Sequence, residues 1–484
     1  MTECRRESAG RKGRKRVRRE PKYEQVAFSF GGSVKPTLRC DAEAVTSDVG
    51  LLPLRELDER LGLVVAAAEC IEDLRRPEMV VHPLVRLLRE TVYAYAAGYE
   101  DANDHGPLNS DELFRHLIGP INTASVNPKK HEGTASEATI SRLLGGRKLI
   151  WEAFNEVHRK WFLLAMRGRA PRVLTLDVDG YDVETHGGQQ LTLFNGYYGQ
   201  EMYYPLKVSV AEWGMILGNI LRPGDSGANT GAEELLRPTI EFLKLHFPKT
   251  RLRLRADSGF MNGRLYRLCE EFGIEYAIRL RLNKTLKGLI ERLLVPGIER
   301  EIPPARRNQR WSLYRETTYR AGSWKRERRI IMKITHNPSK PSEKQLERYV
   351  LVTNSRRSIR NVWNFYGHRG QCEQRIDELK NHLRADKLSC TLFDRNDFKL
   401  HLFVMAHNLY AVARICLPPE HQLKRATIAR MRICLVKCGA TVRRTSRRLW
   451  LHASRNWPYR DLLLDLSRRF ASGRLTPMPI WDTG

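Results

Sequence analysis

The chain has 484 residues, of which 42% are hydrophobic, and this composition excludes a disordered chain and predicts at least one large core. No run approaches the roughly 18 apolar residues of a membrane span, and nine cysteines without a CxxC pair indicate reduced thiols rather than a zinc site or a disulfide framework. The formal net charge of +28 predicts a polyanionic partner, with nucleic acid favoured over an acidic membrane surface.

Basic side chains dominate the N-terminus, where seven of the nine residues from Arg11 to Arg19 are Lys or Arg. The segment has no apolar period, so residues 1–44 are predicted to form a basic, largely disordered arm. This arm either contacts DNA or serves as a solubilising tail. Because the N-terminus also lacks the apolar core of a signal peptide, we expect a cytoplasmic protein.

The next region, residues 45–170, is predicted to be helical and to bind DNA. Residues 51–63 and 83–99 carry apolar side chains at the three-to-four spacing of an amphipathic helix. The segment GYEDANDHG at 98–106 combines acids, Asn and His, which suits either metal ligands or a turn rich in capping side chains. The turn is the favoured interpretation.

A short helix is predicted within residues 134–148, TASEATISRLLGGRK. Ser136 is a candidate N-cap, and Arg142 lies on the outward polar face of the helix. Such a helix suits insertion into a major groove, although any capped amphipathic helix has the same pattern.

The pattern changes to alternating β-branched residues at 172–185, which predicts a strand. Asp177 and Asp179 share one face of this strand, close to its end. Two buried acids are unfavourable unless a positive charge lies beside them. A divalent metal explains them, and so does a capping turn before Gly180.

Two further strands are predicted within 190–210, followed by a helix at 233–246 and a strand–helix–strand unit at 251–283. Asp257 follows the first strand of that unit. Ligand-binding groups of α/β sheets collect at the carboxyl ends of strands, so Asp257 is a second candidate ligand. The alternative is that it caps the next helix.

Residues 284–348 form a basic segment that is predicted to be a β-rich inserted sheet, before the chain returns to the main sheet at 349–354. Trp311 and Trp324 are interleaved with its basic residues. This combination suits contact with a phosphate backbone and stacking on unpaired bases. Ordinary edge strands with cross-strand aromatic pairs have a similar composition.

A helix is predicted over residues 363–383, WNFYGHRGQCEQRIDELKNHL. One face is apolar and the adjacent face carries four functional side chains, namely Tyr366, Arg369, Glu373 and Lys380. A carboxylate between Arg and Lys suits a metal site that handles phosphate, whereas the alternative is a surface helix with ion pairs. A long buried helix at 397–416 and a basic, helical C-terminal region at 417–484 are predicted to complete the chain.

The order Tyr366-x2-Arg369-x3-Glu373-x6-Lys380 resembles the Tyr-Arg-Glu-Lys signature of bacterial insertion-sequence transposases of the DDE superfamily. The strand ending LDVDG resembles the first acid motif of that superfamily, and RADSGF resembles the second. GYEDANDH and SEATISRL, which precede the sheet, resemble one subgroup of these transposases.

The resemblance implies an α/β fold with a ribonuclease H-like catalytic domain, formed by residues 171–283 and 349–416 and flanked by helical regions. A β-strand insertion is implied between the last core strand and the Glu-bearing helix. Asp179, Asp257 and Glu373 would be the catalytic metal ligands of two Mg²⁺ ions, for which Mn²⁺ would substitute. Asp177 remains the alternative first ligand.

The resemblance also implies which side chains contact DNA. Tyr366, Arg369 and Lys380 would contact phosphates of the transposon end, and Trp311 or Trp324 would receive a flipped base if the reaction passes through a hairpin.

The predicted function is a transposase that binds double-stranded DNA at the terminal inverted repeats of its insertion sequence, cleaves it by metal-dependent hydrolysis and joins the 3′ ends to target DNA. Pairing two ends implies a homodimer, acting at the nucleoid of a bacterial cytoplasm. The alternatives are a nuclease of the same fold, a catalytically inactive DNA-binding repressor, or an RNA-processing ribonuclease.

Overall fold

The computed structural model describes residues 25–28, 36–40, 44–73, 75–122, 133–145, 151–341 and 344–473. Most of the predicted basic arm lies outside these ranges. Its described part contains two short antiparallel strands, β1 (Gln25–Ala27) and β2 (Thr37–Arg39). Within the described ranges, no helix is long and apolar enough to cross a membrane.

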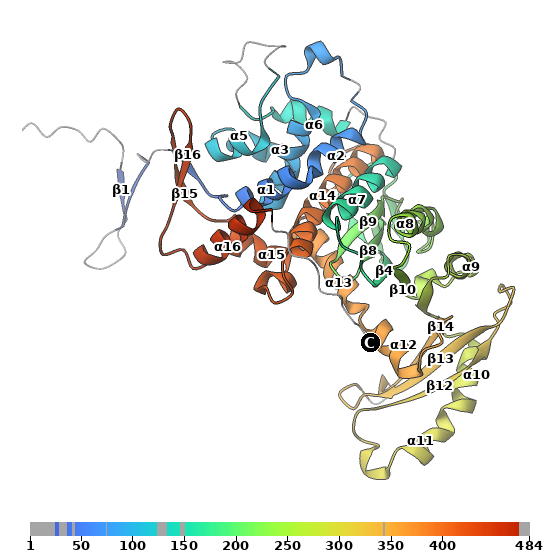
Figure 1. Ribbon diagram of the computed structural model, residues 1–484. Coiled ribbons are helices and arrows are strands. Elements are labelled where there is room, and N and C mark those ends of the chain that lie inside the picture. Colours follow the sequence, from blue (N-terminus) through green and yellow to red (C-terminus); the bar gives the residue numbers. More distant parts are fainter. Residues whose placement is uncertain are drawn as a thin grey trace, which may run out of the picture.

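The region that follows is helical, as predicted (Figure 1). Its helices are α1 (Leu51–Leu61), α2 (Leu63–Glu69), η1 (Pro77–Met79), α3 (Leu84–Ala97), η2 (Ala102–Asp104), α4 (His105–Leu108), α5 (Glu112–Ile118), α6 (Glu137–Gly145) and α7 (Trp151–Ala165). The predicted helix at 51–63 ends early because Gly62 adopts a left-handed conformation, with φ 67°, between α1 and α2.

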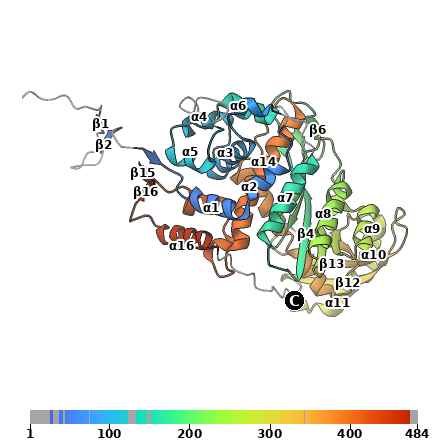
Figure 2. The same ribbon diagram turned by 45° about the horizontal axis from the view of Figure 1, so that its top comes forward.

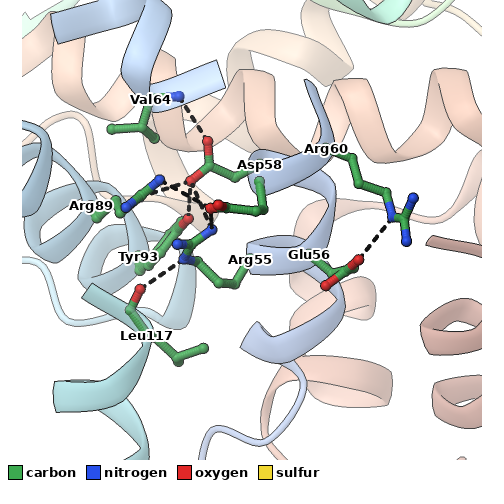
Figure 3. A network of polar contacts seen from close by, with 9 residues as sticks. Arg55, Glu56, Asp58, Arg60, Val64, Arg89, Tyr93 and Leu117 are labelled. Carbon is green, nitrogen blue, oxygen red and sulfur yellow. Dashed lines mark hydrogen bonds and ion pairs between the residues drawn. The ribbon is translucent and has the colours of Figure 1, made fainter. Parts of the chain in front are cut away.

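A buried carboxylate joins helices α1, α2 and α3 (Figure 3). Asp58 of α1 accepts hydrogen bonds from the Val64 backbone N–H at 2.8 Å, Arg89 Nε at 3.1 Å and the Tyr93 hydroxyl. Its charge is therefore paired with Arg89 inside the core, where an unpaired carboxylate would be strongly unfavourable.

The GYEDANDHG segment is a capping turn, so the favoured interpretation is confirmed. Asp101 caps the 3-10 helix η2 in a reciprocal capping box with Asp104. His105 Nδ1 lies 2.9 Å from Glu90 Oε1, and the Glu90 carboxylate accepts the Ala135 backbone N–H at 3.0 Å. These contacts hold the turn between α3 and the segment that leads into α6.

An eight-stranded mixed sheet forms the centre of the molecule, in the order β12-β13-β14-β11-β10-β4-β8-β9. The strands are β4 (Val173–Gly180), β8 (Leu206–Val210), β9 (Met215–Ile220), β10 (Arg251–Ala256), β11 (Glu275–Arg279), β12 (Trp311–Tyr319), β13 (Arg328–His336) and β14 (Leu346–Thr353). Strands β4, β10 and β11 are parallel, and the other pairings are antiparallel.

A smaller sheet, in the order β5-β7-β6, follows the end of β4. Its strands are β5 (Val183–Glu184), β6 (Leu193–Asn195) and β7 (Gln200–Tyr203). Because β7 leads directly into β8, this small sheet connects β4 to β8, which are neighbours in the large sheet.

The segment 284–348 differs from its prediction in two ways. It begins with helices, α10 (Lys284–Leu293), α11 (Val295–Glu301) and η5 (Pro304–Arg306). Its strands β12 and β13 also do not form a separate inserted sheet, because β13 pairs with β14 and β14 pairs with β11. The main sheet is thereby extended away from the helical region (Figure 1).

Helices pack on the large sheet, and two of them, α8 (Ala232–His246) and α14 (Phe393–Cys416), lie where helices were predicted at 233–246 and 397–416. The long helix α14 is almost entirely buried. Helices α7 and α14 contact each other (Figure 2), and both contact β9. Helices α8 and α9 (Gly263–Glu271) contact one another and pack on β9 and β11, respectively.

The C-terminal region, predicted to be helical over 417–484, is only partly helical in its described residues, 417–473, so that prediction is wrong in part. Three short helices come first, η8 (Gln422–Arg425), α15 (Ile428–Met431) and η9 (Arg432–Val436). They are followed by a hairpin of β15 (Ala440–Arg444) and β16 (Leu449–Ala453), and then by α16 (Arg460–Ala471). Strand β15 also pairs with β3 (Val45–Thr46), a segment from the other end of the chain.

Candidate active site

The two acids of β4 have different surroundings. Asp177 is fully buried, and its two oxygens accept Nε and Nη2 of Arg255, each at 2.7 Å. Arg255 belongs to β10, the parallel neighbour of β4, and its Nη1 also donates to the Phe365 carbonyl oxygen at 2.9 Å. Asp177 is therefore half of an internal ion pair that links the sheet to the helix after it.

Asp179 lies two residues further along β4, near the C-terminal end of the strand, and is 8% exposed. Its Oδ2 accepts Nη2 of Arg369 at 2.6 Å. Burial raises the pKa of the Asp179 carboxyl to about 6, although the positive charges of Arg369 and Lys207 oppose this shift. Asp257 and Asp177 raise the pKa further because they add negative charge nearby.

Asp257 follows the end of β10. Parallel pairing of β4 and β10 brings Asp179 and Asp257 to the same edge of the sheet. Asp257 Oδ1 accepts the Gly259 backbone N–H at 2.8 Å and caps the 3-10 helix η4 (Ser258–Phe260), while Asn262 caps α9. One carboxylate oxygen thus caps a short helix, which was the alternative interpretation, and the half-buried side chain lies beside the site.

The predicted continuous helix over 363–383 is interrupted, so that prediction is wrong in detail. The segment consists of α12 (Ile359–Gly367), α13 (Gly370–Asp377) and the π-helix η7 (Glu378–His382). The break at His368 and Arg369 is flanked by Gly367 and Gly370, which weaken a helix.

Arg369 lies at this break and is the centre of the acid cluster. Its guanidinium contacts Asp179 at 2.6 Å and Glu373 at 3.5 Å, and it interacts electrostatically with Asp257. The Glu373 side chain is 72% exposed. Carboxylates from β4, the end of β10 and α13 therefore converge on one positive charge.

The other two signature residues border the same cluster. Lys380 Nζ forms an ion pair with Asp182, three residues after Asp179, at 2.7 Å. Burial raises the pKa of the half-buried Tyr366, which interacts electrostatically with Arg369. The four residues of the signature thus lie around the end of β4, despite the break in the helix.

The remaining predicted DNA contacts lie in other surroundings. Trp324 is buried, edge-on to the Tyr266 ring and beneath the Arg328 guanidinium, so its ring has no open face for a base. The half-buried Trp311 stacks on His336, and Arg142 is exposed on α6. None of these three residues contacts the acid cluster through an observed interaction.

The sequence model of the family described as Transposase DDE domain group 1 matches residues 28–474. The chain belongs to this family of DDE transposases. It is also similar to the solved piggyBac transposase synaptic complex with hairpin DNA, at 14% identity and a TM-score of 0.37 over 90% of this chain and 83% of that one. No curated protein matches the sequence.

DDE transposases generally use divalent metal ions, and the acidic side chains of this transposase are the candidates to hold them. Among the side chains that the structure describes, no three His, Cys, Asp or Glu residues are arranged to hold a metal. The chemistry of the donors nevertheless fits, because carboxylate oxygens are the ligands of hard divalent ions. The acids already surround a cation, the Arg369 guanidinium.

Two residues of the transposase site were not predicted from the sequence. Lys207 of β8 lies opposite Asp179 and is fully buried, with Nζ 3.4 Å from Ser209 Oγ and from Cys372 Sγ. Burial raises the pKa of the Cys372 thiol to about 11, which keeps it neutral. The second residue is Arg255. The available signals were a lysine inside the segment LKVSV and the three arginines that alternate with Leu in RLRLRA.

Proposed function

We propose that this transposase binds the terminal inverted repeats of an insertion sequence, cleaves the DNA by metal-dependent hydrolysis and joins the 3′ ends to target DNA. The observation that carries the proposal is the convergence of Asp179, Asp257 and Glu373 on Arg369 at one edge of the sheet. Family membership supports the same reaction class.

The proposed catalytic domain is ribonuclease H-like and comprises residues 171–283 and 349–416. The order β9-β8-β4-β10-β11 supports this assignment. In this order β9, β8 and β4 are antiparallel neighbours, and β10 and β11 run parallel to β4, which is the first of the five strands in the chain. The proposed roles of the other regions are DNA binding for 45–170, an insertion for 284–348 and a basic C-terminal region for 417–484, which would contribute to a homodimer when two ends are paired.

The proposed ligands of two Mg²⁺ ions, or of Mn²⁺ in their place, are Asp179, Asp257 and Glu373. When bound, the ions activate the attacking water or 3′-hydroxyl and stabilise the leaving oxygen. Asp179 is favoured over Asp177, since both oxygens of Asp177 are bonded to Arg255. Arg369 would exchange its carboxylate partners for a DNA phosphate, to which a guanidinium binds equally well in two-point contacts.

Lys380 and Tyr366 would hold the phosphates on either side of the cleaved bond. Lys380 is anchored by Asp182 close to the acid cluster, so its charge is already directed to the site. These residues would orient the DNA strand. An oriented strand loses less translational and rotational entropy on the way to the transition state, and the reaction is faster for that reason.

The test is cleavage of a labelled duplex that carries the terminal repeat, in Mg²⁺. Glu373→Gln should bind the duplex normally but cleave it roughly a thousand-fold more slowly, because a metal ligand contributes several kcal/mol to the transition state. Asp377→Asn is the matched control, since Asp377 is a half-exposed acid on the same helix and should not affect cleavage.

Equal cleavage by wild type and Glu373→Gln would exclude the catalytic assignment. Tight binding without cleavage by either protein would favour the repressor. If cleavage occurs, a joining assay with a 3′-hydroxyl end then separates the transposase from a nuclease of the same fold.

Salt should weaken DNA binding steeply. With a net charge of +28, many Lys and Arg side chains are available to neutralise phosphates, and each contact releases a counterion. If six to ten phosphates are contacted, affinity should fall by about 10³–10⁵ between 50 and 200 mM salt. Fluorescence anisotropy with a labelled duplex measures this slope, and a shallow slope would contradict electrostatic DNA binding.

A further inference from the structure

The hairpin of β6 and β7 exposes a group of large apolar side chains beside the acid cluster. Tyr197 and Phe194 are 86% and 62% exposed, and Leu191, Leu193 and Tyr198 are exposed to a smaller extent. A soluble chain rarely exposes adjacent aromatic rings without a binding role. The hairpin connects β4, which carries Asp179, to β8, which carries Lys207.

Three tyrosines form a continuous row from the tip of this hairpin to the end of β4. The ring centroids of Tyr197 and Tyr198 are 5.0 Å apart, and those of Tyr198 and Tyr204 are 5.8 Å apart. A Cβ at Gly180 would lie 2.9 Å from Tyr204 Cζ, so only glycine allows this approach next to Asp179. The row therefore begins beside the first acid and ends in solvent.

Two hydrogen bonds of the Asn195 side chain hold the hairpin tip in place. Asn195 Oδ1 accepts the backbone N–H of Tyr197 at 3.0 Å, and Asn195 Nδ2 donates to the Gly224 carbonyl oxygen at 2.6 Å. Asn195 is itself buried. The exposed rings are thus presented in a defined orientation, which reduces the entropy lost on binding.

Positively charged side chains lie near the inner end of the row. The Arg222 guanidinium lies 4.6 Å from the centre of the Tyr204 ring, and its buried Nη2 has no hydrogen-bond partner. Asp182 accepts both Gln200 Nε2 of the hairpin at 3.3 Å and Lys380 Nζ at 2.7 Å. The Asp182–Lys380 pair also borders a cavity of about 630 Å³, which is large enough to admit a nucleotide.

We propose that the exposed rings of this row, Tyr197 and Tyr198 with Phe194 beside them, are a stacking surface for unpaired bases of the DNA strand at the cleavage site, and that Tyr204, edge-on to Tyr198 and beneath the Arg222 guanidinium, supports them from the inner end. The inference rests on the proposed function for the position of the cleaved bond. Aromatic rings beside cations bind single-stranded DNA, since each base has a face that stacks on a ring while its phosphate meets the positive charge. The row would hold the strand open next to Asp179.

The test measures DNA binding without metal, so that cleavage does not enter. The probes are a blunt duplex and the same duplex with an oligo-deoxyadenosine overhang containing 2-aminopurine. Tyr197→Ala should weaken binding of the overhang duplex about 5- to 140-fold and leave blunt-duplex binding unchanged. Tyr197→Phe should retain both the affinity and the quenching of 2-aminopurine, because it retains the ring.

Leu245→Ala is the matched control, since Leu245 is 75% exposed on α8 and should affect neither probe. An equal loss on both duplexes, or no loss on either, would overturn the proposal. The proposal would also be overturned if the wild-type protein formed an oligomer in the absence of DNA and Tyr197→Ala dissociated it. A second copy of the chain would then cover the row. If the wild type prefers the overhang duplex but Glu373→Gln still cleaves DNA, only the proposed catalytic role of Glu373 would be refuted.

Discussion

Asp177→Asn is expected to lower the free energy of unfolding by about 3–5 kcal/mol, because it removes the charge partner of a buried arginine. Arg255 is 3% exposed, and both of its bonds to Asp177 are 2.7 Å long. Chemical denaturation followed by circular dichroism measures this loss. The loss of DNA cleavage by this variant should follow its loss of folded protein.

Asp179→Asn is the matched comparison two residues along the same strand. This variant should retain most of its stability, since burial already disfavours the charged form and raises the pKa of Asp179 to about 6. Its cleavage should nevertheless be lost even when the chain is fully folded. A stable Asp177→Asn protein that binds but does not cleave would instead assign the first metal ligand to Asp177.

Glu378→Gln is expected to produce a loss of stability of similar size, about 3–5 kcal/mol. Glu378 is fully buried in η7, where its oxygens lie 2.7 Å from Arg414 Nη2 and 2.8 Å from Arg375 Nη1. Without the carboxylate, Arg414 would remain buried beside a second positive charge. Since Glu378 belongs to η7, its loss should also release the segment that carries Lys380.

Acid should produce the same destabilisation in the wild-type protein. Burial opposes ionisation of Glu378, but His407 and the charges of Arg414 and Arg375 outweigh it and hold the pKa well below the usual 4.5. The stabilisation is thus complete above about pH 4.5 and is lost as the pH falls. Comparing unfolding of wild type and Glu378→Gln from pH 7 downward should show their difference shrinking, and a constant difference would contradict this linkage.

The sequence by itself determined the local elements and the family. The helices at 233–246 and 397–416, the strand that ends in Asp179 and the position of Asp257 after its strand are encoded by short apolar periods and flanking turn residues. The resemblance that rests on the spacing of residues around Glu373 predicted a DDE transposase, and the family match confirms membership of that family.

Only the tertiary structure decided the surroundings of each acid. Asp177 and Asp179 share a face of one strand, and they differ because Arg255, 78 residues later, bonds to the first, and Arg369, 190 residues later, to the second. Strand β15 likewise pairs with β3, which comes from the other end of the chain. Periodicity records the few residues on either side of a position, whereas ion pairs and strand partners depend on which distant segments the fold brings together.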